Sequence, residues 1–179
     1  MAKEYIFIVG GARSGKSRFA QELAKELGNK VLFIATGEPL DEEMKARIDE
    51  HKKARPKSWR TLEITTNIGK QLEVEIGDAE AVIIDCLTLL VSNLIGEELD
   101  YPKAEKRVLA EINRLIAGMD KLNASFIIIS NEVGTGLVPE TKLGRVYRDI
   151  LGKANQLIAQ RSSKVYFMVA GIPVKIKGD

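Results

Sequence analysis

One stretch near the start of the chain limits what it can be: Gly10-Gly11-Ala12-Arg13-Ser14-Gly15-Lys16-Ser17. It matches the phosphate-loop pattern of a glycine, four residues, then Gly-Lys-Ser. Glycines let backbone N–H groups turn toward phosphate oxygens, and the following helix presents its positive N-terminus to them. Lys16 is expected to reach the β- and γ-phosphates, and the Ser17 hydroxyl suits Mg²⁺. Because residues 5–9 before the loop resemble a buried strand and residues 18–27 after it a helix, a nucleoside phosphate site is predicted rather than a plain glycine turn.

Length and composition indicate one globular domain spanning residues 1–179. A net charge of +2, with basic residues spread along the chain, gives no reason to expect a nucleic-acid partner. The single cysteine, Cys86, excludes an internal disulfide and any multi-cysteine metal site. No apolar run approaches the roughly 18 residues of a membrane span, and the first residues lead directly into a strand. A cytoplasmic protein without a membrane span is expected.

The pattern of apolar residues predicts an α/β fold. Five near-continuous apolar runs are typical of strands buried on both faces of a parallel sheet: residues 6–9, 31–35, 81–84, 126–129 and 165–169. Helices are expected between them, at 18–27, 41–54, 68–76, 87–95, 102–119 and from Thr141, as N-cap, to about 160. Residues 59–63 form a possible further strand, and 172–177 alternate apolar and basic residues as an edge strand does. The prediction is a mostly parallel sheet with helices on both faces and a C-terminal edge strand.

Asp85 follows the apolar run 81–84 directly. A carboxylate at the carboxyl end of a buried strand is where phosphate-loop proteins hold Mg²⁺. Ser17 and Asp85 are therefore the expected metal-binding pair. The alternative is that Asp85 caps the helix that follows it.

Residues 131–136, Asn-Glu-Val-Gly-Thr-Gly, follow another buried strand. Their position places them at the ligand crevice of a doubly wound sheet. Asparagine and glycine also form ordinary turns, so this pattern alone leaves both interpretations open.

The chain has one histidine, His51, on the expected helix with Met44 and Ile48 at apolar spacing. Spacing alone favours a structural histidine at the edge of an apolar stripe. The alternative is a nucleophile that attacks phosphorus and passes the group onward as a phosphoramidate. Cations near it in the sequence would stabilise such a transfer, although a solvated charge run explains them equally well: Arg47, Lys52, Lys53, Arg55 and Arg60.

Several stretches together resemble one family. They are the phosphate loop, Ile34-Ala35-Thr36, Asp41-Glu42-Glu43-Met44, Arg47-Ile48, His51-Lys52, Arg55-Pro56, Trp59-Arg60-Thr61 with Glu63, Asn131-Glu132-Val133-Gly134, Val138-Pro139-Glu140, and Gly171-Ile172-Pro173 with Lys177. In this order they are similar to the bifunctional adenosylcobinamide kinase and adenosylcobinamide-phosphate guanylyltransferase of cobalamin biosynthesis. The likeness runs from Ile6 to Lys177, and the segment from Asp41 to Glu63 is its most specific part.

The resemblance implies a two-step enzyme with a RecA-like phosphate-loop fold that assembles as a homotrimer. It would phosphorylate adenosylcobinamide, a corrinoid, from ATP or GTP with Mg²⁺. It would then transfer GMP from GTP through a guanylylated histidine, which by position is His51. With Lys16, this residue forms the expected catalytic pair. The implied nucleotide contacts are Gly10, Gly11, Ala12, Arg13, Ser14, Gly15, Lys16, Ser17, Ala35, Thr36, Gly37, Lys52, Lys53, Ala54, Arg55, Glu63 and Asp85.

The chain departs from the family pattern in two places: the connection at 96–101 is short, and the glycine loop contains Thr135 and Leu137. These departures affect the expected shape of the loops. Two other functions compete with this one. The first is a small-molecule kinase in which His51 is structural; it would form no guanylyl-enzyme. The second is a GTP-binding switch, but the chain has no Asn-Lys-x-Asp stretch of the kind that reads guanine.

Overall fold

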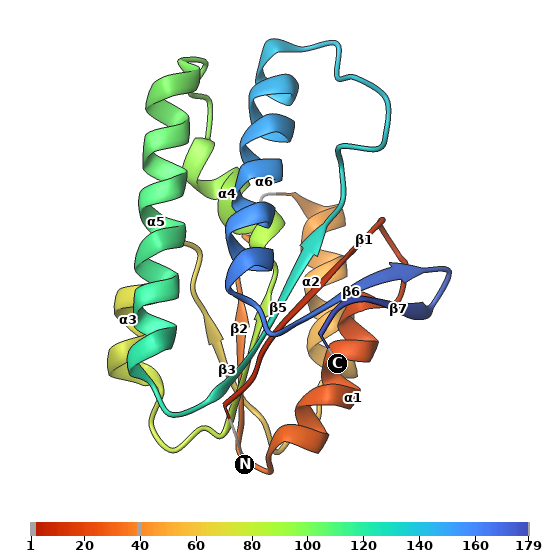
Figure 1. Ribbon diagram of the computed structural model, residues 1–179. Helices are drawn as coiled ribbons and strands as arrows, with labels where there is room; N and C mark the ends of the chain where they lie inside the picture. Colours follow the sequence, from red (N-terminus) through yellow and green to blue (C-terminus); the bar gives the residue numbers. More distant parts are fainter. Residues whose placement is uncertain (1–2, 39–40, 179) are drawn as a thin grey trace.

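A seven-stranded sheet forms the centre of the molecule in the computed structural model, which describes residues 3–38 and 41–178 (Figure 1). Its strands lie in the order β3-β2-β4-β5-β1-β6-β7. All neighbours are parallel except β6 and β7, which are antiparallel. The strand bounds are β1 (Tyr5–Gly10), β2 (Val31–Ala35), β3 (Arg60–Glu63), β4 (Ala81–Asp85), β5 (Ser125–Asn131), β6 (Lys164–Val169) and β7 (Ile172–Lys177).

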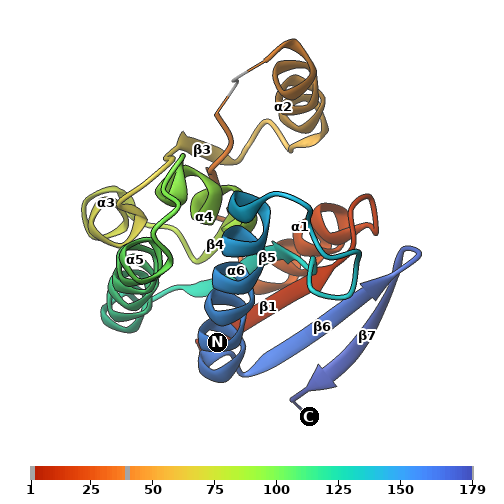
Figure 2. The same ribbon diagram turned by 90° about the horizontal axis from the view of Figure 1, so that it is seen from above.

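The helices cover both faces of this sheet (Figures 1 and 2). They are α1 (Lys16–Leu27), α2 (Glu42–Ala54), α3 (Ile68–Glu75), α4 (Leu87–Ile95), α5 (Tyr101–Lys121) and α6 (Lys142–Arg161). All six expected helices are present, with bounds within two residues of the prediction. The Thr141 hydroxyl caps α6 as expected, because its Oγ1 accepts a hydrogen bond of 3.1 Å from the Gly144 N–H.

Strand alternation divides the core into two layers. Ile6, Ile8, Ile127 and Ile129 pack with Ala20 of α1 on one face. On the other face, side chains of the same strands, such as Phe7 and Phe126, pack in one cluster with α3, α4, α5 and α6. Because β1, β2, β4 and β5 are buried on both faces, their apolar runs are continuous, as the sequence predicted.

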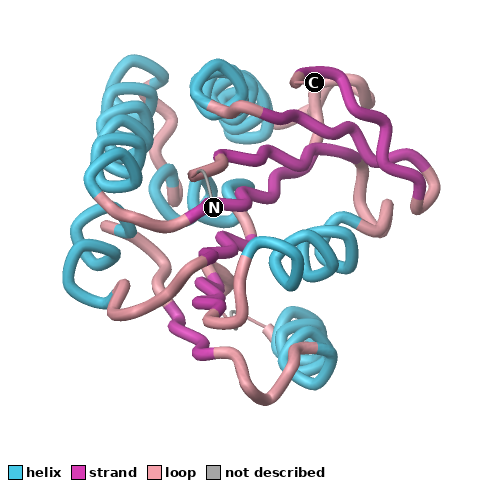
Figure 3. The backbone as a smooth tube through the Cα atoms, turned by 60° about the horizontal axis from the view of Figure 1, so that its bottom comes forward, coloured by secondary structure: helices cyan, strands magenta, loops and turns pink. Residues whose placement is uncertain are grey.

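The edge of the sheet next to the phosphate loop is a hairpin. Strands β6 and β7 extend from the body as a pair (Figure 3), joined by a two-residue turn at Ala170 and Gly171, which have φ values of 50° and 84°. All six residues of β7 are exposed, which confirms the predicted edge strand.

Because β1, β2, β4 and β5 are parallel, their carboxyl ends lie together along one side of the sheet, which is called the carboxyl edge. In the register, Gly10 lies opposite Asn131, and Ala35 lies opposite Asp85. The predicted phosphate loop, metal carboxylate and Asn131 turn therefore share the carboxyl edge, where ligands bind in open α/β sheets. No helix in the described ranges 3–38 and 41–178 is both long and apolar enough to cross a membrane.

Candidate active site

The phosphate loop joins β1 to α1 in the shape that its glycines permit. Gly15 has a φ of 91°, and a side chain there would also crowd the Gly171 Cα at 3.2 Å. The Gly171 N–H donates a hydrogen bond of 3.1 Å to the Ser14 carbonyl, so the β6–β7 turn supports the loop from outside. The Ser14 hydroxyl is buried and has no hydrogen-bond partner among the residues that the structure describes. A buried hydroxyl without a partner is costly, and a phosphate oxygen at this loop would satisfy it.

Lys16 begins α1 and is directed back toward the loop. Its side chain is 8% exposed, and its Nζ donates to the carbonyls of Gly10 at 3.1 Å and Gly11 at 2.5 Å. Burial lowers the pKa of Lys16, and the nearby Asp85 carboxylate opposes that shift. A partly desolvated ammonium that needs an anion therefore lies at the N-terminus of a helix, where phosphate binding is favoured.

Ser17 and Asp85 meet, as predicted. The Ser17 hydroxyl donates a hydrogen bond of 2.8 Å to the Asp85 carboxylate, which ends β4. The alternative role for Asp85 as a helix cap is wrong, because the N-cap position of α4 belongs to Cys86. Burial raises the pKa of the Cys86 thiol to about 11, so this cysteine stays protonated and is no nucleophile near neutral pH.

The Ser17–Asp85 pair fits a magnesium ion by its chemistry. A hydroxyl and a carboxylate are hard oxygen donors, and Mg²⁺ in phosphate-transfer sites typically takes one or two protein ligands, with phosphates and water completing its shell. Among the described residues, no three His, Cys, Asp or Glu side chains gather into a metal site of their own. Ser17 and Asp85 suit an ion whose remaining ligands come from the nucleotide and water.

Asp85→Asn is expected to raise the Mg²⁺ concentration for half-maximal kinase activity by about tenfold, because a neutral amide is a poorer magnesium ligand. The melting temperature should change little, since the Ser17 hydroxyl can still donate to the amide oxygen. Magnesium titration of activity and a thermal melt measure the two effects. An unstable variant with a normal magnesium titration would assign Asp85 a structural role instead.

Arg55 contributes a cation from the end of α2. Its guanidinium carbon lies 3.9 Å from the centroid of the Phe33 ring on β2, and its Nε and Nη1 are buried without hydrogen-bond partners in the described part of the chain. Burial lowers the pKa of Arg55, and the carboxylates of Asp85 and Glu63 oppose that shift. Stacking on an aromatic ring fixes the guanidinium plane. The unpartnered donors then suit a phosphate group.

The other predicted nucleotide contacts divide into exposed and buried residues. Lys52 of α2 forms an ion pair with Glu63 at the end of β3, and Lys53 is exposed. Thr36 is fully buried and its hydroxyl bonds both the N–H and the carbonyl of Cys86. Its N–H donates to the Asp85 carbonyl at 3.1 Å, and its carbonyl accepts from Asn93 Nδ2 at 2.8 Å. Thr36 therefore holds the ends of β2 and β4 together, and its nucleotide contact stays a prediction.

Two more contacts lie beside α2. Ala35 is buried in β2, and a Cβ at Gly37 would lie 3.3 Å from Cδ1 of Leu89 on α4 and 3.5 Å from Cδ1 of Ile48 on α2. Gly37 therefore lies between α4 and α2. The side chain of Ala54 falls outside the described part of the structure, as do those of Met44 and Arg47.

His51 is exposed on α2, the helix at the rim of the molecule in Figure 2. It does not pack into the core, so it is accessible to a substrate. One neighbouring cation was misplaced by sequence reasoning. Arg60 points to the carboxyl end of α3, where its guanidinium donates to the carbonyls of Glu75 and Ile76. It does so because a cation stabilises a helix C-terminus.

Sequence reasoning missed a buried polar network behind β5. The Ser130 hydroxyl donates to Oδ1 of Asn155 on α6 at 2.7 Å, and the Asn131 N–H donates to Oγ1 of Thr88 on α4 at 2.7 Å. The Asn155 amide also donates to the Asn131 carbonyl at 3.3 Å. The only signal in the sequence was the polar end of an otherwise apolar run, because the partners come from helices distant in the chain.

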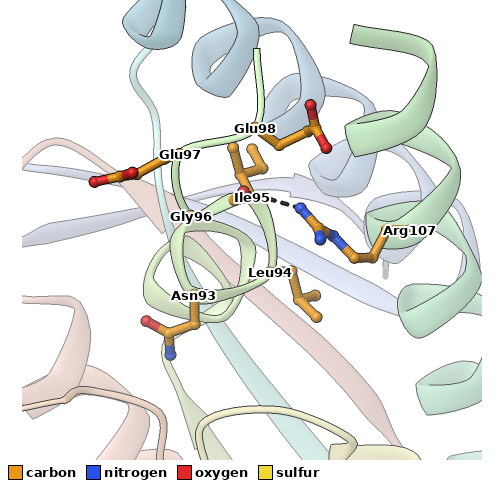
Figure 4. A pocket seen from close by; sticks show the side chains of 7 residues that line it. All are labelled: Asn93, Leu94, Ile95, Gly96, Glu97, Glu98 and Arg107. Carbon is orange, nitrogen blue, oxygen red and sulfur yellow. Dashed lines mark hydrogen bonds between the residues drawn. The ribbon is translucent and has the colours of Figure 1, made fainter. Parts of the chain in front are cut away.

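Two cavities lie away from the phosphate loop. One, of about 390 Å³, is at the carboxyl end of α4, where Arg107 donates a hydrogen bond of 2.9 Å to the Ile95 carbonyl (Figure 4). The other, of about 450 Å³, lies between the start of α5, Gly134 and α6. The first is lined by none of the predicted site residues, and the second includes Gly134 of the predicted crevice segment 131–136. The candidate site is defined by the loop, Asp85 and Arg55.

Comparison with known proteins identifies the family. The model of the cobinamide kinase / cobinamide phosphate guanyltransferase family matches residues 6–176. The chain belongs to this family. It is 42% identical over 180 residues to the bifunctional adenosylcobalamin biosynthesis protein CobU of Escherichia coli, covering 96% of this chain and 99% of the relative. The corresponding CobU of Salmonella typhimurium is 41% identical with the same coverage.

A third relative, the bifunctional adenosylcobalamin biosynthesis protein CobP of Pseudomonas aeruginosa, is 42% identical over 172 residues, 96% of each chain. These matches confirm the family predicted from the residues between Ile6 and Lys177. The roles of the individual site residues stay predictions, and the structure shows which of them lie together.

Proposed function

We propose that this member of the cobinamide kinase and guanylyltransferase family carries out both reactions of the family name. It would phosphorylate the aminopropanol hydroxyl of adenosylcobinamide and then attach GMP to that phosphate, through a guanylylated His51. The proposal is supported by the family match and by one geometric observation in particular. Lys16, Ser17 and the Asp85 carboxylate meet at the N-terminus of α1.

In the kinase step, the acceptor hydroxyl oxygen bonds to the γ-phosphorus, the bond from that phosphorus to the bridging oxygen breaks, and the nucleoside diphosphate leaves. The hydroxyl proton passes to water. The loop N–H groups and Lys16 hold the phosphates and stabilise the charge on the leaving oxygen. Mg²⁺, held through Ser17 and Asp85, would supply further positive charge to the phosphates.

In the guanylyl step, a neutral imidazole nitrogen of His51 bonds to the α-phosphorus of GTP and pyrophosphate leaves. A phosphate oxygen of the phosphorylated corrinoid then attacks the same phosphorus, and the imidazole leaves. Arg55, four positions from His51 in the chain, has buried donors without partners among the described residues, and Lys52 is held beside Glu63. An exposed nucleophile suits this role, because an acceptor much larger than a nucleotide has to reach it.

The homotrimer implied by the family resemblance is part of this proposal. The hairpin offers a surface of the kind that self-association covers. Ile172 and Ile176 of β7 are 64% and 61% exposed on the free edge of the sheet. An exposed apolar edge strand is a pairing surface unless something covers it.

The protein incubated with α-labelled GTP and Mg²⁺ is expected to retain label that is lost in mild acid and survives alkali, as a phosphoramidate does. One pyrophosphate should be released for each label retained. γ-Labelled GTP provides the control, because its label leaves with the pyrophosphate. A protein that phosphorylates cobinamide yet retains no α-label would be a kinase alone, with His51 in a structural role.

A further inference from the structure

Asn131 is placed by the sheet between the two parts of the candidate site. It ends β5, the strand that separates β1 from β4. Gly10, which opens the phosphate loop, is its register partner on one side. On the other side, Asp85 pairs with Ile129, two residues earlier in β5. Two residues of a strand span about 7 Å, so Asn131 lies just beyond the metal carboxylate along the sheet.

Strand alternation decides the face on which its side chain lies. Ile127 and Ile129 pack with Ala20 and Ala24 of α1, while the Ser130 hydroxyl bonds Asn155 on the opposite face. Successive side chains of a strand point to opposite faces. The Asn131 carboxamide is therefore on the α1 face, which also carries the phosphate loop and Lys16.

The backbone of Asn131 is held on both sides of its Cα. Its N–H donates to Thr88 Oγ1 at 2.7 Å, and its carbonyl accepts from Asn155 Nδ2 at 3.3 Å. Ser130 fixes the orientation of the Asn155 amide, because its hydroxyl donates to Oδ1 at 2.7 Å. Thr88, Ser130 and Asn155 are at most 9% exposed. Buried and satisfied polar groups of this kind hold a single geometry.

A shared acceptor joins this segment to Lys16. The Gly10 carbonyl accepts from the N–H of Glu132 at 3.0 Å and from the Lys16 ammonium at 3.1 Å. The peptide that follows Asn131 and the phosphate-binding cation therefore meet at one oxygen. The Asn131 side chain itself is half-buried and makes no hydrogen bond to any part of the chain that the structure describes.

We propose that the Asn131 carboxamide is a further catalytic residue, whose N–H₂ group donates a hydrogen bond to the γ-phosphate of the bound triphosphate. Thr88 and Asn155 are its positioning residues. A neutral amide suits this place beside Lys16, since it supplies a directed donor without adding a second charge to repel the ammonium. The inference rests on the proposed function for its kinase step, but the binding contact that it predicts does not require the corrinoid.

The test compares nucleotides that differ only in the γ-phosphate. Binding of ADP and of the imido analogue of ATP, each with Mg²⁺, is measured by calorimetry for wild type and Asn131→Ala, and repeated with the guanine nucleotides. In Asn131→Ala we expect about a tenfold or greater loss of affinity for the triphosphate analogue, which is the loss expected for a hydrogen bond to a charged group. The affinity for the diphosphate should change by no more than about twofold. Kinase turnover should fall by a similar or larger factor.

Three further variants keep the test decisive. Asn131→Asp keeps the shape of the side chain and places a negative charge by the γ-phosphate, so it should lose more triphosphate affinity than the alanine variant. Asn113→Ala removes an exposed asparagine from α5 and should behave as wild type. Thr88→Val should give a weaker form of the same loss, still confined to the triphosphate.

Equal loss of diphosphate and triphosphate affinity in Asn131→Ala and Asn131→Asp would overturn the proposal, because it would show that the side chain only supports the loop. Unchanged affinity for both nucleotides would overturn it as well. A wild-type protein that fails to phosphorylate cobinamide, but loses triphosphate affinity on mutation of Asn131, would contradict the proposed function and leave this inference standing.

Discussion

Lys16→Ala is expected to reduce kinase turnover by about 30- to 800-fold, which corresponds to roughly 2–4 kcal/mol of lost transition-state stabilisation. The ammonium lies 3.1 Å from the Gly10 carbonyl and 2.5 Å from that of Gly11, at the mouth of the loop. From there it is placed to follow the charge that moves onto the leaving β-phosphate. Steady-state turnover of cobinamide with saturating nucleotide and Mg²⁺ measures the effect.

Two variants separate charge from structure in that experiment. Lys25→Ala removes an exposed lysine from the same helix and should keep full activity. Lys16→Arg keeps the charge but not the compact ammonium, and should recover only part of the turnover. Activity of Lys16→Ala within a few-fold of wild type, with a normal melting temperature, would mean that the loop shapes the fold and does not act on phosphate.

The elements of this fold could be predicted because each has a local signal. Residues buried on both faces give continuous apolar runs, so β1, β2, β4 and β5 were visible in the sequence. Thr141 predicted the start of α6, because threonine is a common N-cap residue and its hydroxyl does cap this helix. The phosphate-loop pattern located Lys16 and Ser17, and the end of a buried apolar run located Asp85. The Ser17–Asp85 contact could then be predicted, because parallel strands end on the same side of the sheet.

Contacts between segments distant in the chain had no such signal. The stacking of Arg55 on Phe33 depends on how α2 returns to β2, and periodicity does not describe that path. Arg60 was expected near His51 because the two are close in sequence, yet it caps α3. The network of Thr88, Ser130 and Asn155 joins two helices to one strand end. Such contacts are tertiary, and only the folded chain shows them.

His51→Ala is expected to abolish the acid-labile guanylyl adduct and the corrinoid-independent release of pyrophosphate from GTP. No other histidine exists in the chain, so no second imidazole can take its place. Phosphorylation of cobinamide should persist within a few-fold of wild type, because Lys16, Ser17 and Asp85 are the residues proposed for that step and none of them touches His51 in the described contacts. Adduct, pyrophosphate and cobinamide phosphate are measured on the same preparation.

A split between the two activities is the result that would support a covalent role for His51. Substitution of an exposed side chain on α2 should leave the fold intact, and a thermal melt checks this. Lys45→Ala removes an exposed side chain of the same helix that is not among the predicted nucleotide contacts, so it is the matched control for general damage to the helix and should leave both activities unchanged. Equal loss of both activities with a normal melt would show that His51 binds a nucleotide shared by the two steps. Undiminished adduct in His51→Ala would place the GMP on another side chain. An adduct on a hydroxyl resists mild acid and one on a carboxyl is lost in alkali, so an adduct that is still lost in mild acid and kept in alkali would be on a lysine nitrogen.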